Sequence, residues 1–402
     1  MRLFVLSSNP PMPSWGTSMA FHRHLVERDD FQISVATDNL QVLEFPVRYP
    51  LVLLRSHRLL ARLQRTRAGL WAHAWQHLVS GRRLDPRVLA AAQAFKPQIV
   101  LSSVSSWSWT NEMAWRLADR LRLPLVASFN DWFSYNLLAP PCLIKRVECR
   151  FRAFYRRADL ALCTSEGMRE ALGPHGNAQI LYPLGAAARQ EPSGLQLASS
   201  ASKPFSVLFA GNIGEWYGPM LEQLVSLWRQ SGNCVSFRIF GSNPSWTHEF
   251  DSWSRREGIF RGQVPFDTLQ GEAASANLLL VPMGFDPSVE IVERTSFKTK
   301  FMDYVSFQKP IVVWGPTYCS AVRIAQKFDS ALCCTTPNPR DCLDSIHKLA
   351  LDPARQLILV QNARRMYQDR FNPEQIHRVL VDHCQDLVSG SNGNVARRNA
   401  AA

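Results

Sequence analysis

The residues TSFKTKFMDYVSFQKPIVVWGP, Thr295 to Pro316, join a short helical pattern to a buried strand. The helical part has its apolar residues on one face and ends at Lys309-Pro310. Ile311 to Trp314 are all apolar and stop at Gly315-Pro316, as a buried strand does. Because a helix that leads into a buried parallel strand is half of a βαβ unit, the stretch predicts an α/β domain.

The start of this helix has the chemistry of a phosphate site. Thr295, Ser296 and Thr299 supply hydroxyl groups, and the first backbone N–H groups of a helix have no partner within it. Such groups bind anions, so a phosphate is expected here. Asp303 lies one turn further along, where its carboxylate reaches the hydroxyls of a ribose. The combination predicts a nucleotide-sugar site.

Outside this stretch, strands and helices alternate in two halves. The strands expected in the first half are Leu3–Leu6, Phe31–Thr37, Gln98–Ser102, Leu125–Ser128, Leu160–Cys163 and Ile180–Pro183. Those expected in the second are Phe205–Ala210, Phe237–Phe240, Leu278–Val281, Ile311–Trp314 and Ala331–Cys333. The alternation is typical of doubly wound domains, so we predict an α/β fold with two Rossmann-like domains.

The domain boundaries follow from composition. A small, polar stretch without period separates the halves, as a linker does. With 402 residues, 46% of them hydrophobic, the chain is long enough for two cores. The predicted parts are an N-terminal acceptor domain (1–184), the linker (185–203), a C-terminal donor domain (204–371), a terminal helix that packs back on the N-terminal domain (372–388), and a disordered tail (389–402).

Polar loops follow several strands at their carboxyl ends, where open α/β sheets bind ligands. Gly16 and Thr17 follow the first strand, and Asn130, Asp131 and Trp132 follow the fourth. These side chains suit sugar hydroxyls, and we assign Gly16, Thr17 and Trp132 to acceptor binding. The alternatives are a plain turn at Gly16 and a helix N-cap at Asp131.

In the second half a strand runs into a glycine loop and then a helix. Gly211, Asn212 and Gly214 form this loop, and Gly241 ends the next strand. Backbone N–H groups in such a loop cradle phosphate. The spacing is neither Gly-x-Gly-x-x-Gly nor a P-loop. These four residues are therefore assigned to the donor by their place after strands.

Net charge indicates an anionic partner. The formal charge is +12 and the isoelectric point about 9.5. Two segments, 52–83 and 144–157, concentrate arginine, and the first also holds Trp71 and Trp75. Such a segment binds an anionic membrane surface, and the alternative is a core-packing helix with a solvated basic face. Nucleic acid is not expected, because no reader motif accompanies the charge.

Cysteine usage and hydropathy favour a reduced compartment. The nine cysteines are scattered without a Cys-x-x-Cys pair, which excludes zinc ribbons and redox motifs. No apolar run approaches the roughly 18 residues of a membrane span. The start, MRLFVLSSNPPMP, is too short in apolar residues for a signal peptide. We expect a cytoplasmic protein, peripheral at the inner face of the cell membrane.

At this point a family resemblance emerges from the motifs. Residues 299–304 (TKFMDY), followed by Gln308-Lys309-Pro310 and an apolar strand, are similar to the signature Ser/Thr-Lys-x-x-Glu-Tyr-x-x-x-Gly-x-Pro. FNDW at 129–132, LYPLG at 181–185 and LFAGNIG at 208–214 are similar to other fixed points of the same family. The chain resembles the retaining nucleotide-sugar glycosyltransferases of the GT-B fold known as family four.

The resemblance implies two Rossmann-like domains facing across a cleft. The second would hold a nucleoside-diphosphate sugar, with Asp303 on the ribose and Ser296 and Thr299 near the diphosphate. The first would hold a glycan or lipid-linked acceptor. It implies Asp131, Asn130 and Lys300 as catalytic residues, with no cofactor. No Asp-x-Asp pair is present, so no metal is expected. Retaining enzymes of this kind have no agreed nucleophile, and none is assigned.

The sequence departs from the family at three places. The family has two glutamates separated by seven residues, where this chain has Thr295 and Asp303. Gln308-Lys309 replaces the usual glycine before the proline. The basic residues that often follow the glycine turn are missing, and Lys298 and Lys300 are candidates to supply that charge.

Two alternatives follow from these departures. One is a GT-B-like protein that binds a nucleotide sugar or glycan without turnover. The other is an inverting enzyme, which needs a general base that faces the acceptor. His22, His24 and Asp131 are the candidates for that base.

Overall fold

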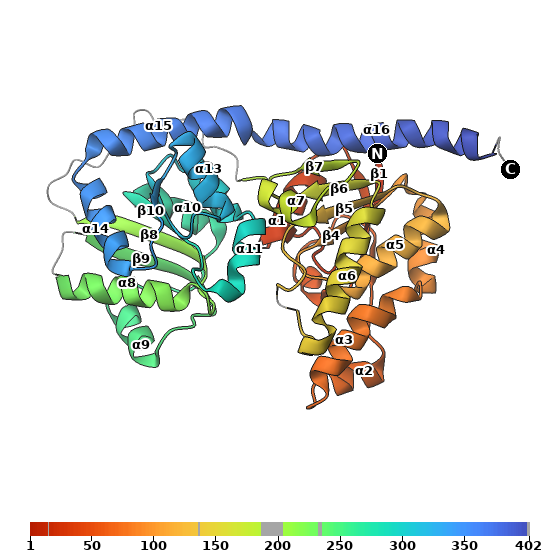
Figure 1. Ribbon diagram of the computed structural model, residues 1–402, viewed down its shortest axis with the longest axis horizontal. Helices are drawn as coiled ribbons and strands as arrows, with labels where there is room; N and C mark the ends of the chain where they lie inside the picture. The colour runs from red at the N-terminus through yellow and green to blue at the C-terminus, as the bar shows by residue number, and fades with distance from the viewer. Residues whose placement is uncertain (15, 136, 186–203, 232–234, 400–402) are drawn as a thin grey trace. The chain divides into compact units, whose positions relative to one another are not determined.

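The computed structural model describes residues 1–14, 16–135, 137–185, 204–231 and 235–399, and of 391–399 only the backbone. Most of the predicted linker, 186–203, lies outside the described residues. The chain divides into two compact units (Figure 1). Unit 1 comprises Met1–Leu184, Thr295–Phe297 and Glu374–Ala402. Unit 2 comprises Gly185–Arg294 and Lys298–Pro373.

Unit 1 is built on a seven-stranded parallel sheet of order β3-β2-β1-β4-β5-β6-β7. The central strands β4, β5 and β6 are buried along their whole length, as in sheets with helices on both faces. The order reverses between β1 and β4. The strands are β1 (Arg2–Leu6), β2 (Gln32–Thr37), β3 (Leu51–Leu53), β4 (Ile99–Val104), β5 (Leu125–Phe129), β6 (Leu160–Cys163) and β7 (Ala178–Ile180).

The helices of unit 1 mostly connect one strand to the next. Their bounds are α1 (Gly16–Leu25), α2 (Arg58–Leu63), α3 (Gly69–Val79), α4 (Pro86–Phe95), α5 (Trp109–Leu121), α6 (Pro141–Arg157), α7 (Glu166–Leu172) and α16 (Pro373–Asn399). Helix α5 begins with a capping box, in which Ser108 and Asn111 satisfy each other's backbone N–H groups. Ser165 caps α7 by accepting a hydrogen bond from the Met168 amide.

The C-terminal helix α16 is held to the α1 region of unit 1 by charged and aromatic contacts. Arg28 donates two hydrogen bonds, of 2.7 and 2.6 Å, to the Glu374 carboxylate. The Nδ1 atoms of His24 and His377 are 3.1 Å apart, and His377 Nε2 lies 3.0 Å from Asp30. The helix continues to Asn399, where we predicted a disordered tail from residue 389. Extension of an existing helix needs no new nucleation, so residues of low helix propensity are included.

Unit 2 has a five-stranded parallel sheet of order β12-β11-β10-β8-β9. The order reverses between β8 and β10, so their carboxyl ends form the topological switch point. The strands are β8 (Phe205–Asn212), β9 (Val235–Ser242), β10 (Leu278–Pro282), β11 (Ile311–Trp314) and β12 (Leu332–Cys334).

Helices cover both faces of this sheet. Helix α8 and helix α15 lie on opposite sides of the strands in Figure 1. Alternate strand residues such as Val207 and Phe209 pack with Leu224 of α8 and Ile346 of α14 in one apolar core. The helices are α8 (Gly218–Ser231), α9 (His248–Arg256), α10 (Phe266–Ser275), α11 (Glu290–Thr295), α12 (Thr299–Ser306), α13 (Ser320–Phe328), α14 (Pro339–Ala350) and α15 (Pro353–Arg370).

Two expectations about helices are wrong in detail. Thr295 does not open a helix, because it is the last residue of α11, and α12 begins only at Thr299. The basic segment 52–83 is not one helix. It contains the end of β3, then α2 and α3, because the Thr66 hydroxyl donates to the Leu63 carbonyl and accepts from the Ala68 amide. Such side-chain bonds to the backbone close a helix. Among the described helices, none combines the length and apolar composition that a membrane span requires.

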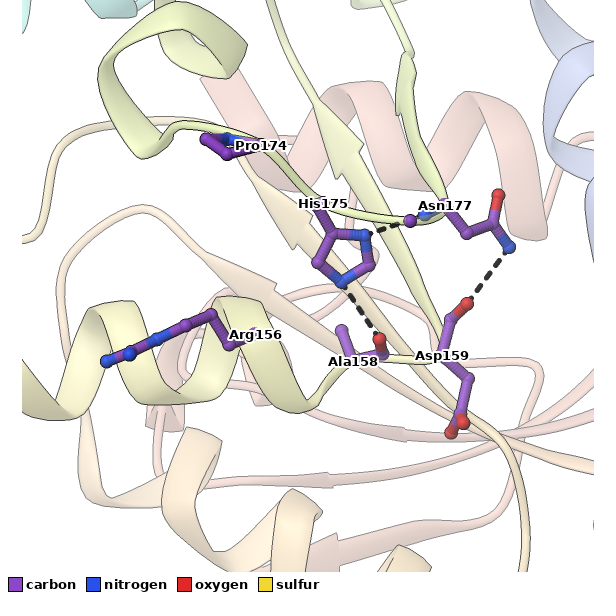
Figure 2. A pocket seen from close by; sticks show the side chains of 7 residues that line it. Arg156, Ala158, Asp159, Pro174, His175 and Asn177 are labelled. Atoms are coloured by element: carbon purple, nitrogen blue, oxygen red, sulfur yellow. Dashed lines mark hydrogen bonds between the residues drawn. The ribbon is translucent and has the colours of Figure 1, made fainter.

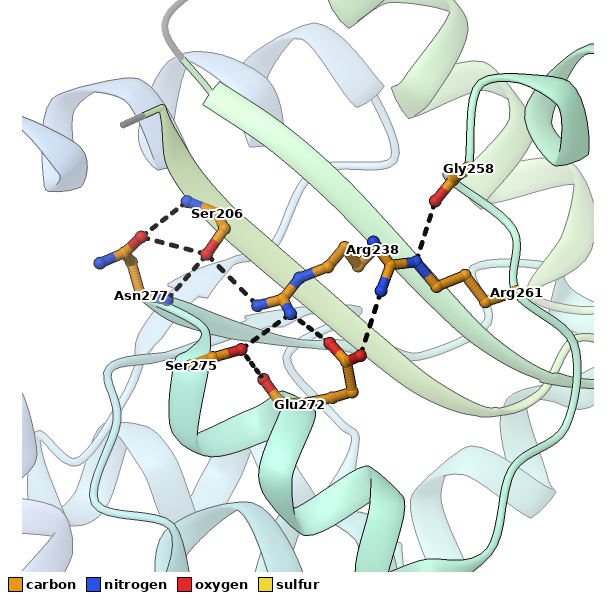
Figure 3. A network of polar contacts seen from close by, with 7 residues as sticks. All are labelled: Ser206, Arg238, Gly258, Arg261, Glu272, Ser275 and Asn277. Atoms are coloured by element: carbon orange, nitrogen blue, oxygen red, sulfur yellow. Dashed lines mark hydrogen bonds and ion pairs between the residues drawn. The ribbon is translucent and has the colours of Figure 1, made fainter. Parts of the chain in front are cut away.

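A polar network fastens α10 to the sheet of unit 2 (Figure 3). Glu272 of α10 forms ion pairs with Arg238 of β9 and with Arg261, the latter at 3.1 Å. Arg238 also donates a hydrogen bond of 2.8 Å to the Ser275 hydroxyl. Asn277 accepts a hydrogen bond of 2.8 Å from the Ser206 amide. The network lies near the amino ends of β8 and β10, and we assign it to stability.

Glu272→Ala is expected to lower the free energy of unfolding by about 2 kcal/mol, because the mostly buried Arg238 guanidinium loses its carboxylate. Urea unfolding followed by circular dichroism measures the change. Glu257→Ala is the matched control, since Glu257 and Arg256 are exposed and 4.0 Å apart. Its effect is expected to stay within about 0.5 kcal/mol. Equal effects of the two variants would contradict the assignment.

Candidate functional site

The switch point of unit 2 brings together the glycine loop and helix α12. The Tyr304 hydroxyl accepts a hydrogen bond of 2.7 Å from the Ala210 amide and donates one of 3.3 Å to the Ala210 carbonyl. This fixes α12 beside the carboxyl end of β8. Lys300 lies about one turn before Tyr304 on the same helix face, so its side chain reaches the glycine loop.

The Lys300 ammonium is buried against this loop without a hydrogen-bond partner among the described residues. Its stem is partly exposed, but Nζ is shielded from solvent. Nζ lies 4.3 Å from the Phe209 ring centroid and 5.3 Å from that of Tyr217. The pKa of Lys300 is lowered to about 7, mainly by burial and also by the Lys298 charge, and the Glu293 charge opposes this shift. A buried cation of this kind has unused capacity to bind an anion.

Glu293 and Tyr217 complete the cluster, and neither was predicted from the sequence. Glu293 is fully buried, and its Oε1 accepts hydrogen bonds from Tyr217 (2.7 Å) and the Gly284 amide (3.1 Å). Its Oε2 lies 3.3 Å from Lys298 Nζ. The only signal in the sequence is an acid five residues before Lys298. Glu293 reaches Tyr217 and Gly284 only because α11 folds back on the loop after β10. A single sequence does not reveal this placement.

Two glycines allow the loop to approach this cluster closely. Gly211 has φ +150°, and a Cβ there would lie 2.6 Å from Lys300 Nζ. Gly241 has φ +155°, and a Cβ there would lie 1.9 Å from the Gly211 carbonyl oxygen. The second glycine therefore serves the packing of β9 on β8, and the first leaves room for the ammonium.

The other predicted donor residues divide between the units. Asn212 is exposed, and Gly214, Thr299 and Asp303 are half-buried in unit 2. Thr295 and Ser296 belong instead to unit 1 and are buried. The Thr295 carbonyl accepts a hydrogen bond of 2.5 Å from the Ser165 hydroxyl. The Ser296 hydroxyl donates to the Asp131 carboxylate within unit 1. The assignment of Thr295 and Ser296 to the donor stays a prediction.

In unit 1 a set of hydroxyl groups lies where the strand order reverses. Thr17, beside the exposed Gly16, accepts a hydrogen bond of 2.8 Å from the Ser105 hydroxyl. Asn130 donates one of 3.0 Å to Ser103. The Asp131 carboxylate accepts one of 2.5 Å from the Ser296 hydroxyl. Hydroxyl, amide and carboxylate groups at the carboxyl ends of strands suit a polyhydroxylated ligand.

Trp132 does not belong to this polar set. It is only 5% exposed, its ring packs edge-on against Phe151, and the Arg152 guanidinium lies 5.2 Å from the ring centroid. Its place in acceptor binding stays a prediction, and these contacts give its ring a packing role in unit 1. Asp131 is not a helix N-cap, since no described helix begins beside it.

The two histidine candidates for a general base are also misplaced. Both lie in the last turns of α1, which begins at the carboxyl edge of the sheet and runs back toward the amino edge. Burial lowers the pKa of His24 to about 3, and His377 faces it. His22 lies 3.1 Å from Glu27. Of the three candidates, only Asp131 lies at a carboxyl strand end.

A surface pocket of about 440 Å³ lies elsewhere in unit 1 (Figure 2). It lies at the amino ends of β6 and β7, the edge opposite to the switch point. His175 accepts a hydrogen bond from the Asn177 amide and donates from Nε2 to the Ala158 carbonyl, at 2.9 and 3.1 Å. Asn177 donates to the Asp159 carbonyl at 2.9 Å. These side chains are engaged in the turn, so the pocket is not a candidate active site.

Comparison with solved structures bears on the fold. Sucrose-phosphate synthase from Thermosynechococcus elongatus is 14% identical with a TM-score of 0.69, over 97% of this chain and 99% of that chain. HepE of Anabaena, in complex with UDP and glucose, is 14% identical with a TM-score of 0.65, over 96% and 99%. The chain has the GT-B fold. The α,α-trehalose 6-phosphate synthase from Burkholderia multivorans is a further GT-B structure, 14% identical with a TM-score of 0.59 over 98% of each chain.

The GT-B prediction is confirmed by these structures, although no protein-family model matches the chain and no curated protein matches it in sequence. Among the described residues, no group of three or more His, Cys, Asp or Glu side chains is placed to hold a metal ion. Among the described residues, Lys298, Lys300 and Glu293 lie together at the switch point of unit 2.

Proposed function

We propose that this GT-B protein is a glycosyltransferase that moves a sugar from a nucleoside-diphosphate sugar to a glycan or lipid-linked acceptor. The observation on which the proposal depends is the buried, unpartnered Lys300 ammonium at the switch point of unit 2. HepE, which has the same fold, binds UDP and UDP-glucose. A diphosphate at Lys300 would satisfy a cation that the described residues leave without a hydrogen bond.

The donor half of the proposal assigns roles within unit 2. Lys300 contacts the diphosphate, supported by Lys298 and by the Gly214 backbone N–H just after β8. The Ile213 amide is already bonded to the Ser242 carbonyl. Asp303 accepts hydrogen bonds from the ribose hydroxyls, and Thr299 lies beside the diphosphate at the start of α12. As the bond between the sugar C1 and the phosphate oxygen breaks, negative charge grows on the leaving diphosphate, and the lysine charge stabilises it.

The acceptor half assigns roles within unit 1. Asn130, Asp131 and Thr17 are proposed to bind hydroxyls of the acceptor. Lys298 and Lys300 are proposed to neutralise the diphosphate, which other transferases do with a divalent metal. We therefore propose a reaction that needs no metal and no cofactor. We propose retention of configuration on the family resemblance, and assign no nucleophile.

A binding protein without turnover is the second candidate, and one observation favours it. Thr295, which stands where the family has its first glutamate, is buried, and its carbonyl is bonded to Ser165. Because residue 295 is a threonine, this position offers no carboxylate for catalysis. A binding isotherm for a nucleotide sugar, without transfer or hydrolysis in the presence of any acceptor, would select this candidate.

The cellular setting is also a proposal. We place the protein in the cytoplasm, peripheral at the inner face of the cell membrane, in the synthesis of a polysaccharide or other glycoconjugate. The exposed basic and apolar side chains of unit 1 support the membrane association.

The proposal is tested first by a thermal-shift screen against nucleotide sugars. A ligand that binds only the native state raises the melting temperature, by an amount that grows with its concentration. The nucleotide sugar that gives the largest shift is then supplied with candidate acceptors, and release of the nucleoside diphosphate is measured. No shift with any nucleotide sugar would overturn the proposal.

Asp303→Ala is expected to weaken donor binding about tenfold, since one carboxylate hydrogen-bonded to a hydroxyl contributes roughly 1.5 kcal/mol. Asp303→Asn keeps one acceptor oxygen, so its donor affinity is expected to lie between that of the wild type and that of Asp303→Ala. A 2′-deoxy donor distinguishes a lost ribose contact from a general loss of structure. Wild type and Asp303→Ala should differ less in affinity for this analogue than for the normal donor. Unchanged affinity in Asp303→Ala would remove this residue from the site.

A further inference from the structure

Five large apolar side chains of α2 and α3 lie exposed on the surface of unit 1. Trp71 and Trp75 are 58% and 60% exposed, and they share one face of α3 because they are four residues apart. Leu59 and Leu63 have the same spacing on α2, and Leu70 precedes Trp71; all three are exposed. Buried alanines and Leu78 occupy the inward side of α3.

The two helices form one continuous surface. Gln64, just after α2, donates a hydrogen bond to Gln76 of α3, and the Gly69 amide donates to the Thr66 carbonyl at 2.9 Å. In Figure 1, α2 and α3 lie together at one end of unit 1, beyond the strands. We call the exposed face of α2, α3 and their connection the Arg–Trp surface.

Exposed arginines accompany these apolar side chains. Arg58, Arg62, Arg65 and Arg67 are all exposed, and none has an ion-pair partner within the described residues. The sequence has no acidic residue between Glu44 and Asp85. The surface therefore combines unneutralised positive charge with apolar side chains that no other part of unit 1 covers.

The second basic segment, 144–157, differs in this respect. Arg150, Arg152 and Arg157 of α6 pair with Glu112, Glu148 and Asp119 at 3.7, 2.9 and 2.5 Å. Three of its six basic side chains are thus paired within unit 1. Its exposed end, Ile144 to Arg146, belongs to α6, which contacts α3.

We propose that the Arg–Trp surface binds an anionic lipid bilayer, with Trp71 and Trp75 at the boundary of headgroups and acyl chains and the arginines on lipid phosphates. The inference deepens the membrane association proposed above and is independent of sugar transfer. Exposed Leu, Trp and Arg on two adjoining short helices, without acidic residues, are typical of bilayer-interface segments. A protein partner that would use the tryptophans and arginines as anchors is the alternative outcome of the test.

Flotation with vesicles tests the proposal. The full chain is mixed with vesicles of phosphatidylcholine alone, or of equimolar phosphatidylcholine and phosphatidylglycerol, at low and at physiological salt. Binding is expected only to the anionic vesicles and is expected to weaken with salt. Arg62→Gln with Arg65→Gln is expected to weaken it roughly 25-fold, since each basic side chain near the surface contributes about a fivefold factor.

Insertion has its own readout. Lipids brominated in their acyl chains are expected to quench part of the tryptophan fluorescence in the wild type, and this part should vanish in Trp71→Phe with Trp75→Phe. Trp71→Ser with Trp75→Ser is expected to weaken vesicle binding about tenfold or more. Leu351→Ser and Arg256→Gln, which change exposed residues of unit 2, are the matched controls and should bind as the wild type does.

The outcomes separate this inference from the proposed function. Donor affinity is measured on the same variants and should be unchanged, because the changes lie outside the donor site. No binding to anionic vesicles at low salt, or equal binding by surface and control variants, would overturn the inference and leave the surface to a protein partner. Vesicle binding without any donor binding would instead overturn the proposed transferase.

Discussion

Lys300→Met is expected to weaken binding of the nucleotide-sugar donor about 100-fold. A hydrogen-bonded ion pair with phosphate in a shielded site contributes roughly 3 kcal/mol, and methionine fills a similar volume without the charge. Turnover at saturating donor should fall by about 10²–10³, because negative charge grows on the diphosphate in the transition state. Isothermal titration and release of the nucleoside diphosphate measure the two effects.

The fold of this variant is a control in itself. Removal of a buried cation that lacks a hydrogen-bond partner is expected to leave the melting temperature of the free protein unchanged or raised. Lys327→Met, on the exposed side of α13, is the matched substitution and should bind donor normally. If Lys300→Met binds donor as tightly as the wild type does, Lys300 is a packing residue and the proposed site is wrong.

Much of the fold was predictable because it depends on local patterns. The buried strands β5, β6 and β11 were predicted within a residue or two, since runs of apolar residues bounded by turns determine them. The glycine turn was placed two residues early, because Gly211 and Asn212 continue β8 and pair with Gly241 and Ser242 of β9. The positions of α11 and of the break between α2 and α3 were not predictable, because Thr66 and Ser165 close or cap helices through bonds that periodicity does not reveal.

The candidate site was predictable only in part, for a related reason. Lys300 was proposed as a substitute for missing basic residues, and its side chain lies against Gly211. Its role in binding stays a prediction. Glu293 was not predicted, because its carboxylate contacts Tyr217, Gly284 and Lys298, which only the fold brings together. The burial of Trp132 was not predicted, because a tryptophan after a strand has the same sequence signal in a core and in a sugar site.

Donor affinity should depend on pH through Lys300. In the free protein burial lowers the pKa of Lys300 to about 7, and only the charged form pairs with a diphosphate. Affinity is therefore expected to be highest below pH 7 and to fall about tenfold per pH unit above it, until the pKa of the complex is reached. A nucleotide sugar is the proper ligand, because its diphosphate, esterified at both ends, does not titrate in this range. Lys300→Arg should bind with little dependence on pH from 6 to 9.

The neighbours of Lys300 should move this dependence in opposite directions. The Glu293 charge raises the pKa of Lys300 and the Lys298 charge lowers it. Glu293→Gln is therefore expected to shift the loss of affinity to lower pH, and Lys298→Met to higher pH, whatever each does to the affinity itself. If Glu293 has a purely structural role, Glu293→Gln would change the maximal donor affinity. The pH at which that affinity is lost would then stay at the wild-type value. Shifts of the same sign in both variants would show that another group controls the pH dependence.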